Sequence, residues 1–170
     1  YPWLAKTTLD PERIVLHLRA LKRLGDPYSD EQIANAPKET QAHLYKIGEE
    51  LGLAFQLRDD YLDAFGDPEK FGKLVGGDII SDKKTYLRIL LNERMSEDDH
   101  KIANRDFSDP ESKVSTIKSL MTKYQVDESA LGIAKQYIDS ALHHLDSIPA
   151  ENHRKVELQN IILELAKRES

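Results

Sequence analysis

The chain has 170 residues, of which 39% are hydrophobic and 32% charged, and its formal net charge is −6. Such a composition is ordinary for one globular domain, and the acidic balance excludes the basic surface that nucleic-acid binding needs. Cysteine is absent, which excludes disulfides and thiolate metal sites. No apolar run approaches the length of about 18 residues that a membrane span needs, so we expect a cytoplasmic protein.

Two short helices are predicted in the first 36 residues. Asp10 and Pro11 are an N-cap and a first helical position, and Gly25 is suited to end the helix that they begin. Ser29 and Gln32 have the spacing of a capping box, which predicts the start of a second helix.

The segment from Pro37 to about Phe65 is predicted to form one long amphipathic helix. Its acidic part places an amide and carboxylates on one face, at spacing i, i+3, i+4 and i+7: Gln56, Asp59, Asp60 and Asp63. Like charges at this spacing destabilise a helix by roughly 0.2–0.5 kcal/mol per pair, so the pattern favours a bound cation. Oxygen ligands without nearby histidine or cysteine favour Mg²⁺. The alternative is an acidic face exposed to solvent.

Glycine and lysine follow this acidic face, at Gly66, Gly72, Lys73, Gly76, Gly77, Lys83 and Lys84. A flexible glycine backbone with interleaved lysine charges is suited to a diphosphate group. Carboxylates followed by such a loop therefore predict a site for a metal-bound diphosphate.

The rest of the chain predicts further helices and no sustained strand. One helix is expected from about Asp82 to Arg94. Later helices are expected to start at the acidic pair after Ser96, at Asp109-Pro110, at Asp127 and after Pro149. The doublet His143-His144 is expected on an exposed helical surface. The predicted fold class is therefore all-α.

FQLRDDYLD, followed by FGDPEKFGKLVGGDIISDKKTYL, closely resembles the second aspartate-rich motif and its sequel in the trans-polyprenyl diphosphate synthases. The resemblance extends from about Ala36 to the C-terminus. It implies a partial isoprenoid-synthase-type helical bundle, in which residues 36–170 are the C-terminal half of a synthase domain.

The resemblance also implies roles for individual side chains. Mg²⁺ ions that bridge to diphosphate are held by Asp59, Asp60 and Asp63. Diphosphate is contacted by Gln56, Lys73 and Lys83. Catalysis depends on Asp59, Asp60, Lys73 and Lys83.

The implied reaction is head-to-tail prenyl transfer. Mg²⁺ and lysines stabilise the departing diphosphate of an allylic substrate. The double bond of isopentenyl diphosphate then attacks the allylic cation, and a diphosphate oxygen accepts the proton. No side-chain nucleophile is needed, in agreement with the absence of cysteine.

The first aspartate-rich motif of these synthases has no counterpart in this chain. Its only other Asp-Asp pair, Asp98-Asp99, is followed by His100-Lys101-Ile102 and not by a third acid at the needed position. We therefore expect the chain alone to be inactive or nearly so, and to form a prenyltransferase only when another part completes it. The alternative is a non-catalytic helical fragment or fusion product. Because a truncated bundle exposes former core surface, we expect that fragment to form a homo-oligomer.

Residues 1–36 resemble the C-terminal tail of the haem c-bearing subunit of cbb-type cytochrome c oxidases. YPWL, LRALKRLG, PYSDEQI and the ANA ending carry this resemblance, and no CxxCH haem-attachment motif is present. We expect a junction near residues 33–37, with a segment 1–35 of foreign origin before the synthase part. The alternative is a divergent synthase in which Lys6-Thr7 is a further diphosphate contact.

Overall fold

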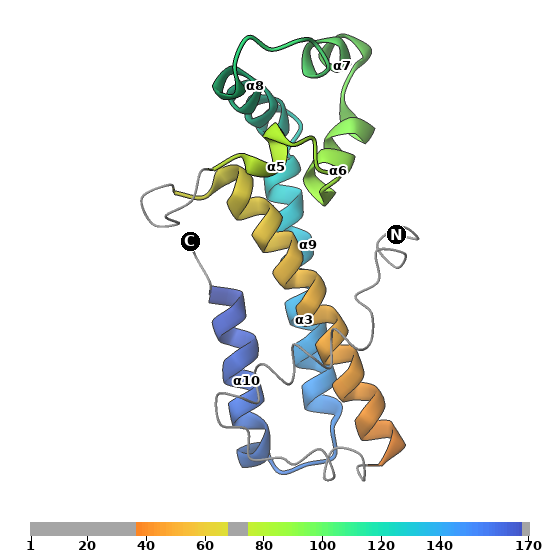
Figure 1. The fold of residues 1–170 in the computed structure, drawn as a ribbon. Coiled ribbons are helices and arrows are strands. Elements are labelled where there is room, and N and C mark those ends of the chain that lie inside the picture. The colour runs from red at the N-terminus through yellow and green to blue at the C-terminus, as the bar shows by residue number, and fades with distance from the viewer. Residues whose placement is uncertain (1–36, 68–74, 168–170) are drawn as a thin grey trace. The chain divides into compact units, whose positions relative to one another are not determined.

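The computed structural model describes residues 37–67 and 75–167, and all regular structure in these ranges is helical (Figure 1). The all-α fold class is thereby confirmed. The predicted N-terminal helices, the expected junction, Lys6 and Lys73 lie outside the described residues. None of the described helices is long and apolar enough to cross a membrane. In chain order they are α3 (Lys38–Phe65), α5 (Gly77–Ile80), α6 (Tyr86–Arg94), α7 (Glu97–Ala103), α8 (Pro110–Lys123), α9 (Val126–Ser147) and α10 (Asn152–Lys167).

The described residues fall into two compact units that share the long helices α3 and α9. Unit 1 contains α3 as far as Leu53, α9 from Gln136 onward, and α10. Unit 2 is the segment Ala54–Lys135, which contains the second half of α3, the shorter helices α5 to α8, and the beginning of α9. The acidic face predicted from the sequence belongs to unit 2.

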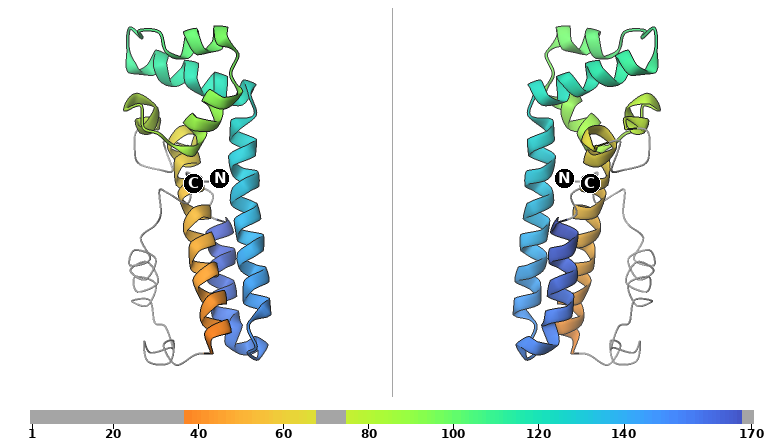
Figure 2. Two further views of the ribbon diagram at one scale, coloured as in Figure 1. Left: turned by 90° about the vertical axis from the view of Figure 1, so that its right-hand side faces the viewer. Right: turned by 90° about the vertical axis from the view of Figure 1, so that its left-hand side faces the viewer.

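Unit 1 is a set of three helical segments around an aliphatic core. Figures 1 and 2 show α10 running alongside the parts of α3 and α9 that belong to this unit. Ile47 from α3, Ala141 and Leu145 from α9, and Ile162 from α10 are almost completely buried. Removal of these apolar surfaces from water is the main stabilising contribution in this unit.

A polar contact joins α3 to α9 within unit 1. The Nδ1 atoms of His43 and His144 lie 3.0 Å apart, and the Ser140 hydroxyl donates to Glu50 Oε1 at 2.6 Å. His143 is exposed as predicted, but the expectation was wrong for His144, which is partly buried against α3. The sequence did not indicate this contact because it depends on the packing of two helices about 100 residues apart.

Unit 2 is organised around α8, which contacts α5, α6 and α7. Its core contains large apolar side chains that are almost fully buried: Leu87 and Leu91 of α6, Ile117 and Met121 of α8, and Val126 at the start of α9. The core thus lies between short helices that follow one another closely in the sequence.

Side-chain caps fix where the helices of unit 2 begin. The hydroxyl of Ser96 accepts from the Asp99 amide, and Asp109 Oδ1 accepts from the Ser112 amide at 2.7 Å, which confirms both predicted starts. The predicted start at Asp82 was wrong. Asp82 has a left-handed φ of 51°, and α6 begins only after Thr85, whose hydroxyl accepts from the Arg88 amide.

The junction between α8 and α9 is stabilised by hydrogen bonds from one arginine. Arg94 Nη1 lies 2.9 Å from the Tyr124 carbonyl, 3.0 Å from the Gln125 carbonyl and 2.8 Å from the Ser129 hydroxyl. Gln125, at the turn itself, has a left-handed φ of 53°. The Tyr124 carbonyl, at the C-cap of α8, gains a partner in this way, whereas the Gln125 carbonyl also accepts from the Ser129 amide at 3.2 Å.

Candidate functional site

The predicted acidic face lies in the second half of α3, within unit 2. Gln56 and Asp59 are exposed, whereas Asp60 has only 7% of its surface exposed. Gln56 Nε2 donates to Asp60 Oδ1 at 2.9 Å. A buried carboxylate needs hydrogen bonds or a counter-charge, and the amide one turn earlier supplies the first of these.

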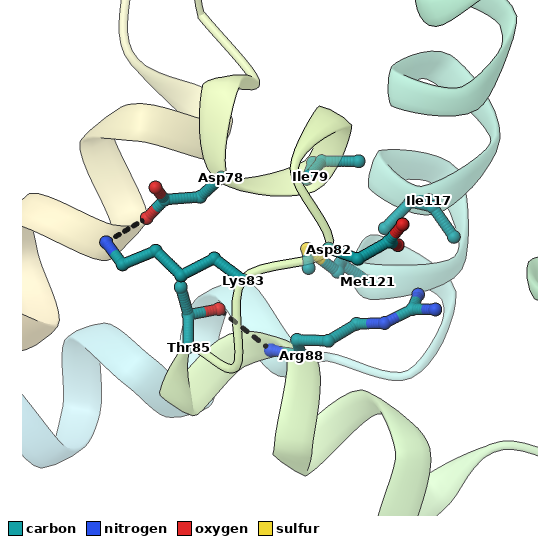
Figure 3. Close-up of a pocket in the computed structure, with 8 residues that line it drawn as sticks. All are labelled: Asp78, Ile79, Asp82, Lys83, Thr85, Arg88, Ile117 and Met121. Carbon is teal, nitrogen blue, oxygen red and sulfur yellow. Dashed lines mark hydrogen bonds and ion pairs between the residues drawn. The ribbon is translucent and has the colours of Figure 1, made fainter. Parts of the chain in front are cut away.

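Lys83 supplies positive charge to this face. Its Nζ lies 2.7 Å from Asp78 Oδ2 and 3.7 Å from Asp60 Oδ1. Figure 3 shows the Lys83 side chain extended toward Asp78. The ammonium is thus shared between the two acids, and Asp78 is its closer partner. About half of the lysine side chain remains exposed, at 52%.

The third acid of the motif, Asp63, holds the loop after α3. Its Oδ2 accepts from the Asp78 amide at 2.8 Å, and its backbone carbonyl accepts from the Gly76 amide at 2.6 Å. These bonds fix the start of the short helix α5 beside α3. Asp63 therefore has a structural function in addition to the predicted ligand function.

Position 76 requires glycine for two reasons, its backbone conformation and the lack of space for a side chain. Its φ is +93°, in the region that favours glycine. A Cβ atom there would lie 2.7 and 2.8 Å from the two methyl groups of Val114 on α8. The glycine lets α5 lie directly against α8, which sets the position of the segment that carries Asp78 and Lys83.

Burial and charge act against each other at Asp60. Burial raises the pKa of the Asp60 carboxyl above its ordinary value of 3.8, and the Gln56 hydrogen bond and the Lys83 charge oppose the rise. The hydrogen bond to Asp78 raises the pKa of the Lys83 ammonium, which keeps it charged. An additional cation near Asp60 would lower the cost of its ionisation.

A small pocket lies behind Lys83, between the α5–α6 segment and α8 (Figure 3). It is lined by Asp78, Ile79, Asp82, Lys83, Thr85, Arg88, Ile117 and Met121. Its polar side chains come from α5, the α5–α6 segment and the start of α6, and its apolar side chains are Ile79 of α5 and Ile117 and Met121 of α8. Lys83 thus lines this pocket as well as contacting Asp60 and Asp78.

The donor atoms on the acidic face fit a magnesium ion that is shared with phosphate. Among residues 37–67 and 75–167, no three histidine or acidic side chains converge as a closed metal cluster. Mg²⁺ usually takes only one or two protein carboxylates and completes its six ligands with water and phosphate oxygens. Asp59 is exposed, and a carboxylate has about four acceptor positions, so the contacts made by Asp60 and Asp63 do not exhaust them.

The structure brings together five of the residues that form this candidate site, all within unit 2: Gln56, Asp60, Asp63, Asp78 and Lys83. Asp59 lies on the same helix but faces solvent. Lys73 lies outside the described residues. Sequence reasoning missed Asp78, although its place directly after two glycines, and five residues before a predicted site lysine, was a signal that could have identified it.

The family model described as Polyprenyl synthetase matches residues 30–124. That is more than half of the chain. The chain belongs to the polyprenyl synthetase family. The heptaprenyl diphosphate synthase component 2 of Geobacillus stearothermophilus is 30% identical over 138 residues, which are 80% of this chain and 42% of that protein.

Solved structures of the polyprenyl synthetase family share this fold. A geranylgeranyl pyrophosphate synthetase from Pyrococcus horikoshii Ot3 is 31% identical with a TM-score of 0.71, over 78% of this chain and 41% of that one. A geranylgeranyl pyrophosphate synthase from Corynebacterium glutamicum, complexed with isoprenyl diphosphate and magnesium, is 28% identical with a TM-score of 0.67 over 81% of this chain and 40% of that one. The chain thus spans less than half the length of each of these relatives.

Proposed function

We propose that the acidic face of α3 and Lys83 form one half of the active site of a polyprenyl diphosphate synthase. In this proposal the chain binds an allylic diphosphate through Mg²⁺ and, completed by the other half of the site, condenses it with isopentenyl diphosphate. The observation that supports it best is the placement of Lys83. Its ammonium lies beside the buried Asp60 while it is bonded to Asp78.

The charges of these side chains agree with a metal-bound diphosphate ligand. Asp59, Asp60, Asp63 and Asp78 carry four formal negative charges, and Lys83 carries one positive charge. The excess negative charge favours a divalent cation, and the half-exposed ammonium favours an anion beside it. Magnesium diphosphate has both signs of charge in one ligand.

Each residue has a defined task in this proposal. Asp59, Asp60 and Asp63 would hold magnesium, which supplies Lewis-acid stabilisation of the diphosphate oxygens. Gln56, which donates to Asp60, would orient the Asp60 carboxylate and would contact diphosphate. Lys83 neutralises part of the charge that develops on diphosphate as its bond to the allylic carbon breaks. After the new carbon–carbon bond has formed, a diphosphate oxygen accepts the proton that the resulting carbocation loses.

Two assays test this function, one for ligand binding and one for turnover. Titration calorimetry measures the affinity of the chain for inorganic pyrophosphate in the presence of Mg²⁺, and a second assay adds allylic and isopentenyl diphosphate. We expect measurable Mg²⁺-dependent binding that is lost in Asp59→Ala, with little or no turnover. Asp98→Ala is the matched control, because Asp98 is the exposed first member of the other acidic pair. Equal losses in both variants, or no binding at all, would contradict the proposal.

The alternative function, a non-catalytic module that self-associates, has support from exposed apolar side chains. Tyr45 and Val156 of unit 1 are 47% and 45% exposed. Size-exclusion chromatography with light scattering tests for the expected homo-oligomer, and a clean monomer at all concentrations would argue against it.

We propose separately that residues 1–36 derive from the C-terminal tail of the haem c-bearing subunit of a cbb-type cytochrome c oxidase. A haem-attachment sequence in the reading frame upstream of Tyr1 would support their origin in an oxidase subunit.

A further inference from the structure

Lys113 of α8 reaches the backbone segment that carries Lys83. Its Nζ lies 2.6 Å from Asp82 Oδ2 and 3.1 Å from the Ile80 carbonyl. The Lys113 side chain is only 17% exposed, whereas the Asp82 side chain is 65% exposed. Most exposed ion pairs contribute little, but this lysine is largely buried and also donates to a backbone carbonyl at the end of α5.

The residue that Lys113 holds has an unusual backbone. Asp82 has a φ of 51°, a left-handed conformation that side chains other than glycine adopt at a cost and that persists where the surrounding contacts require it. Asp82 directly precedes Lys83, so its φ and ψ set the direction in which the Lys83 side chain leaves the turn. The Lys83 amide donates to the Asp78 carbonyl at 3.0 Å, which closes the turn on its other side.

Both ends of α5 are thus held by neighbouring residues of α8. Val114 fills the space beside Gly76 at the start of the helix, and Lys113 binds the carbonyl and carboxylate at its end. Figure 3 shows Asp82 and Lys83 extending to different sides of the same turn. Within the part of the chain that the structure describes, Lys113 makes its polar contacts with Ile80 and Asp82 and none with the acidic face of α3, so any effect of Lys113 on that face passes through the turn.

We propose that Lys113 is a positioning residue for Lys83: by binding Asp82 and the Ile80 carbonyl, it fixes the left-handed turn that directs the Lys83 ammonium toward the diphosphate site. This inference rests on the proposed function. It assigns to α8 a part in diphosphate binding although α8 contributes no group that touches the ligand.

A double-mutant cycle tests whether Lys113 acts through Lys83. Affinity for inorganic pyrophosphate with Mg²⁺ is measured in Lys113→Met, Lys83→Met and the double variant. We expect Lys113→Met to weaken binding about fivefold in the unsubstituted chain and to have no further effect in the Lys83→Met background. Affinity for Mg²⁺ alone should stay unchanged. Independent, additive losses would overturn the inference.

The controls separate positioning from general stability. Lys123→Met is matched, because Lys123 also lies on α8 and makes an ion pair of 2.6 Å, in its case with Asp99. It should lower the melting temperature and leave pyrophosphate affinity unchanged. Lys113→Arg, which keeps the charge and the donors, should restore affinity to within about twofold of the unsubstituted chain. Asp82→Asn removes the charge of the same pair from its exposed side, with a residue type that also tolerates a left-handed φ. It should weaken pyrophosphate affinity even if Lys113→Met folds poorly, and unchanged affinity would count against the inference.

A measurement without ligand distinguishes failure of this inference from failure of the proposed function. Hydrogen–deuterium exchange should rise in residues 77–85 of Lys113→Met and not in Lys123→Met. If the unsubstituted chain binds no magnesium pyrophosphate, the proposed function fails, and exchange alone decides whether Lys113 holds the turn. Unchanged exchange in residues 77–85 would overturn the inference in either case.

Discussion

The two Asp-Asp pairs of this chain, Asp59-Asp60 and Asp98-Asp99, differ in how the charge of their buried member is balanced. In each pair the first residue is exposed and the second is buried, with 7% exposure for Asp60 and 6% for Asp99. Asp99 Oδ2 accepts from Lys123 Nζ at 2.6 Å and also from the Tyr124 hydroxyl. Asp60 receives an amide hydrogen bond, and the ammonium nearest to it is bonded to Asp78 instead.

This difference separates a structural carboxylate, Asp99, from the one to which the proposed function assigns a bound cation, Asp60. The hydrogen bonds from Lys123 and Tyr124 lower the pKa of Asp99, whereas burial raises the pKa of Asp60. Folding therefore favours the charged form of Asp99 and disfavours that of Asp60. A bound cation would favour the charged form of Asp60, whereas the charged form of Asp99 is already favoured without one.

The largest expected difference between the two pairs is in ligand binding. Asp60→Asn should weaken the binding of inorganic pyrophosphate with Mg²⁺ by about tenfold or more, because it removes a charge that has no close ammonium of its own. Asp99→Asn should leave this affinity within about twofold of the unsubstituted chain. Titration calorimetry measures both. Similar losses in the two variants would mean that the pairs do not differ in function.

Without metal, Asp99→Asn should lower the thermal stability more than Asp60→Asn, the reverse of their order in ligand binding. Asp99→Asn should lower the melting temperature by about 5 °C, because it weakens the charged hydrogen bonds that join α7 to the end of α8. Asp60→Asn should change it by less than about 2 °C, because folding already disfavours the Asp60 charge. Differential scanning calorimetry in the presence of a chelator measures this. A larger loss in Asp60→Asn would contradict the comparison.

The pH dependence of stability sharpens the comparison further. Because the pKa of Asp99 is lowered from 3.8 in the folded protein, its contribution is fully present above that value and is lost as the pH falls through the folded pKa. Asp99→Asn should therefore flatten the fall in melting temperature below about pH 4 and leave the curve above it parallel to that of the unsubstituted chain. A change in slope only near neutral pH would exclude Asp99 as its cause.

The smallest effect is expected at the exposed neighbour of Asp99. Asp98 and Lys101 form an ion pair of 2.8 Å, but their side chains are 88% and 75% exposed. Pairs of this kind contribute little, so Asp98→Asn should change the melting temperature by less than about 1 °C. A loss as large as that of Asp99→Asn would show that burial is not what distinguishes adjacent acids on α7.

Those features of the fold that depend on neighbouring residues were predictable from the sequence. The start of α8 was indicated by Asp109 and Pro110, and the start of α7 by Ser96, because an N-cap side chain binds an amide within three residues of itself. The long helix α3 was predicted from Pro37 to about Phe65 and extends over Lys38–Phe65, since its apolar pattern extends over the whole segment.

The features that depend on packing were not predictable. The four-residue helix α5 is held by Asp63 and by Val114, and no local pattern in its own sequence indicates it. The sequence placed Asp59 and Asp60 on one face but could not tell which of them is buried, because that depends on the rotation of α3 within unit 2. The position of Asp78 after two glycines marked it as a candidate, but its bond to Lys83 was not predictable, because that bond exists only when the turn between them is formed.

The fastening of Arg94 to the α8–α9 junction has a practical consequence for labelling this protein. A peptide tag or protease site inserted at residues 124–126 would separate the carbonyls that Arg94 binds. The exposed segment of residues 104–106, between α7 and α8, is held by weaker contacts: Arg88 Nη2 lies 3.4 Å from Asn104 Oδ1, and the Arg105 guanidinium lies 5.1 Å from the centre of the Phe107 ring. An insertion there should therefore be tolerated and should leave the helix that carries Lys113 intact.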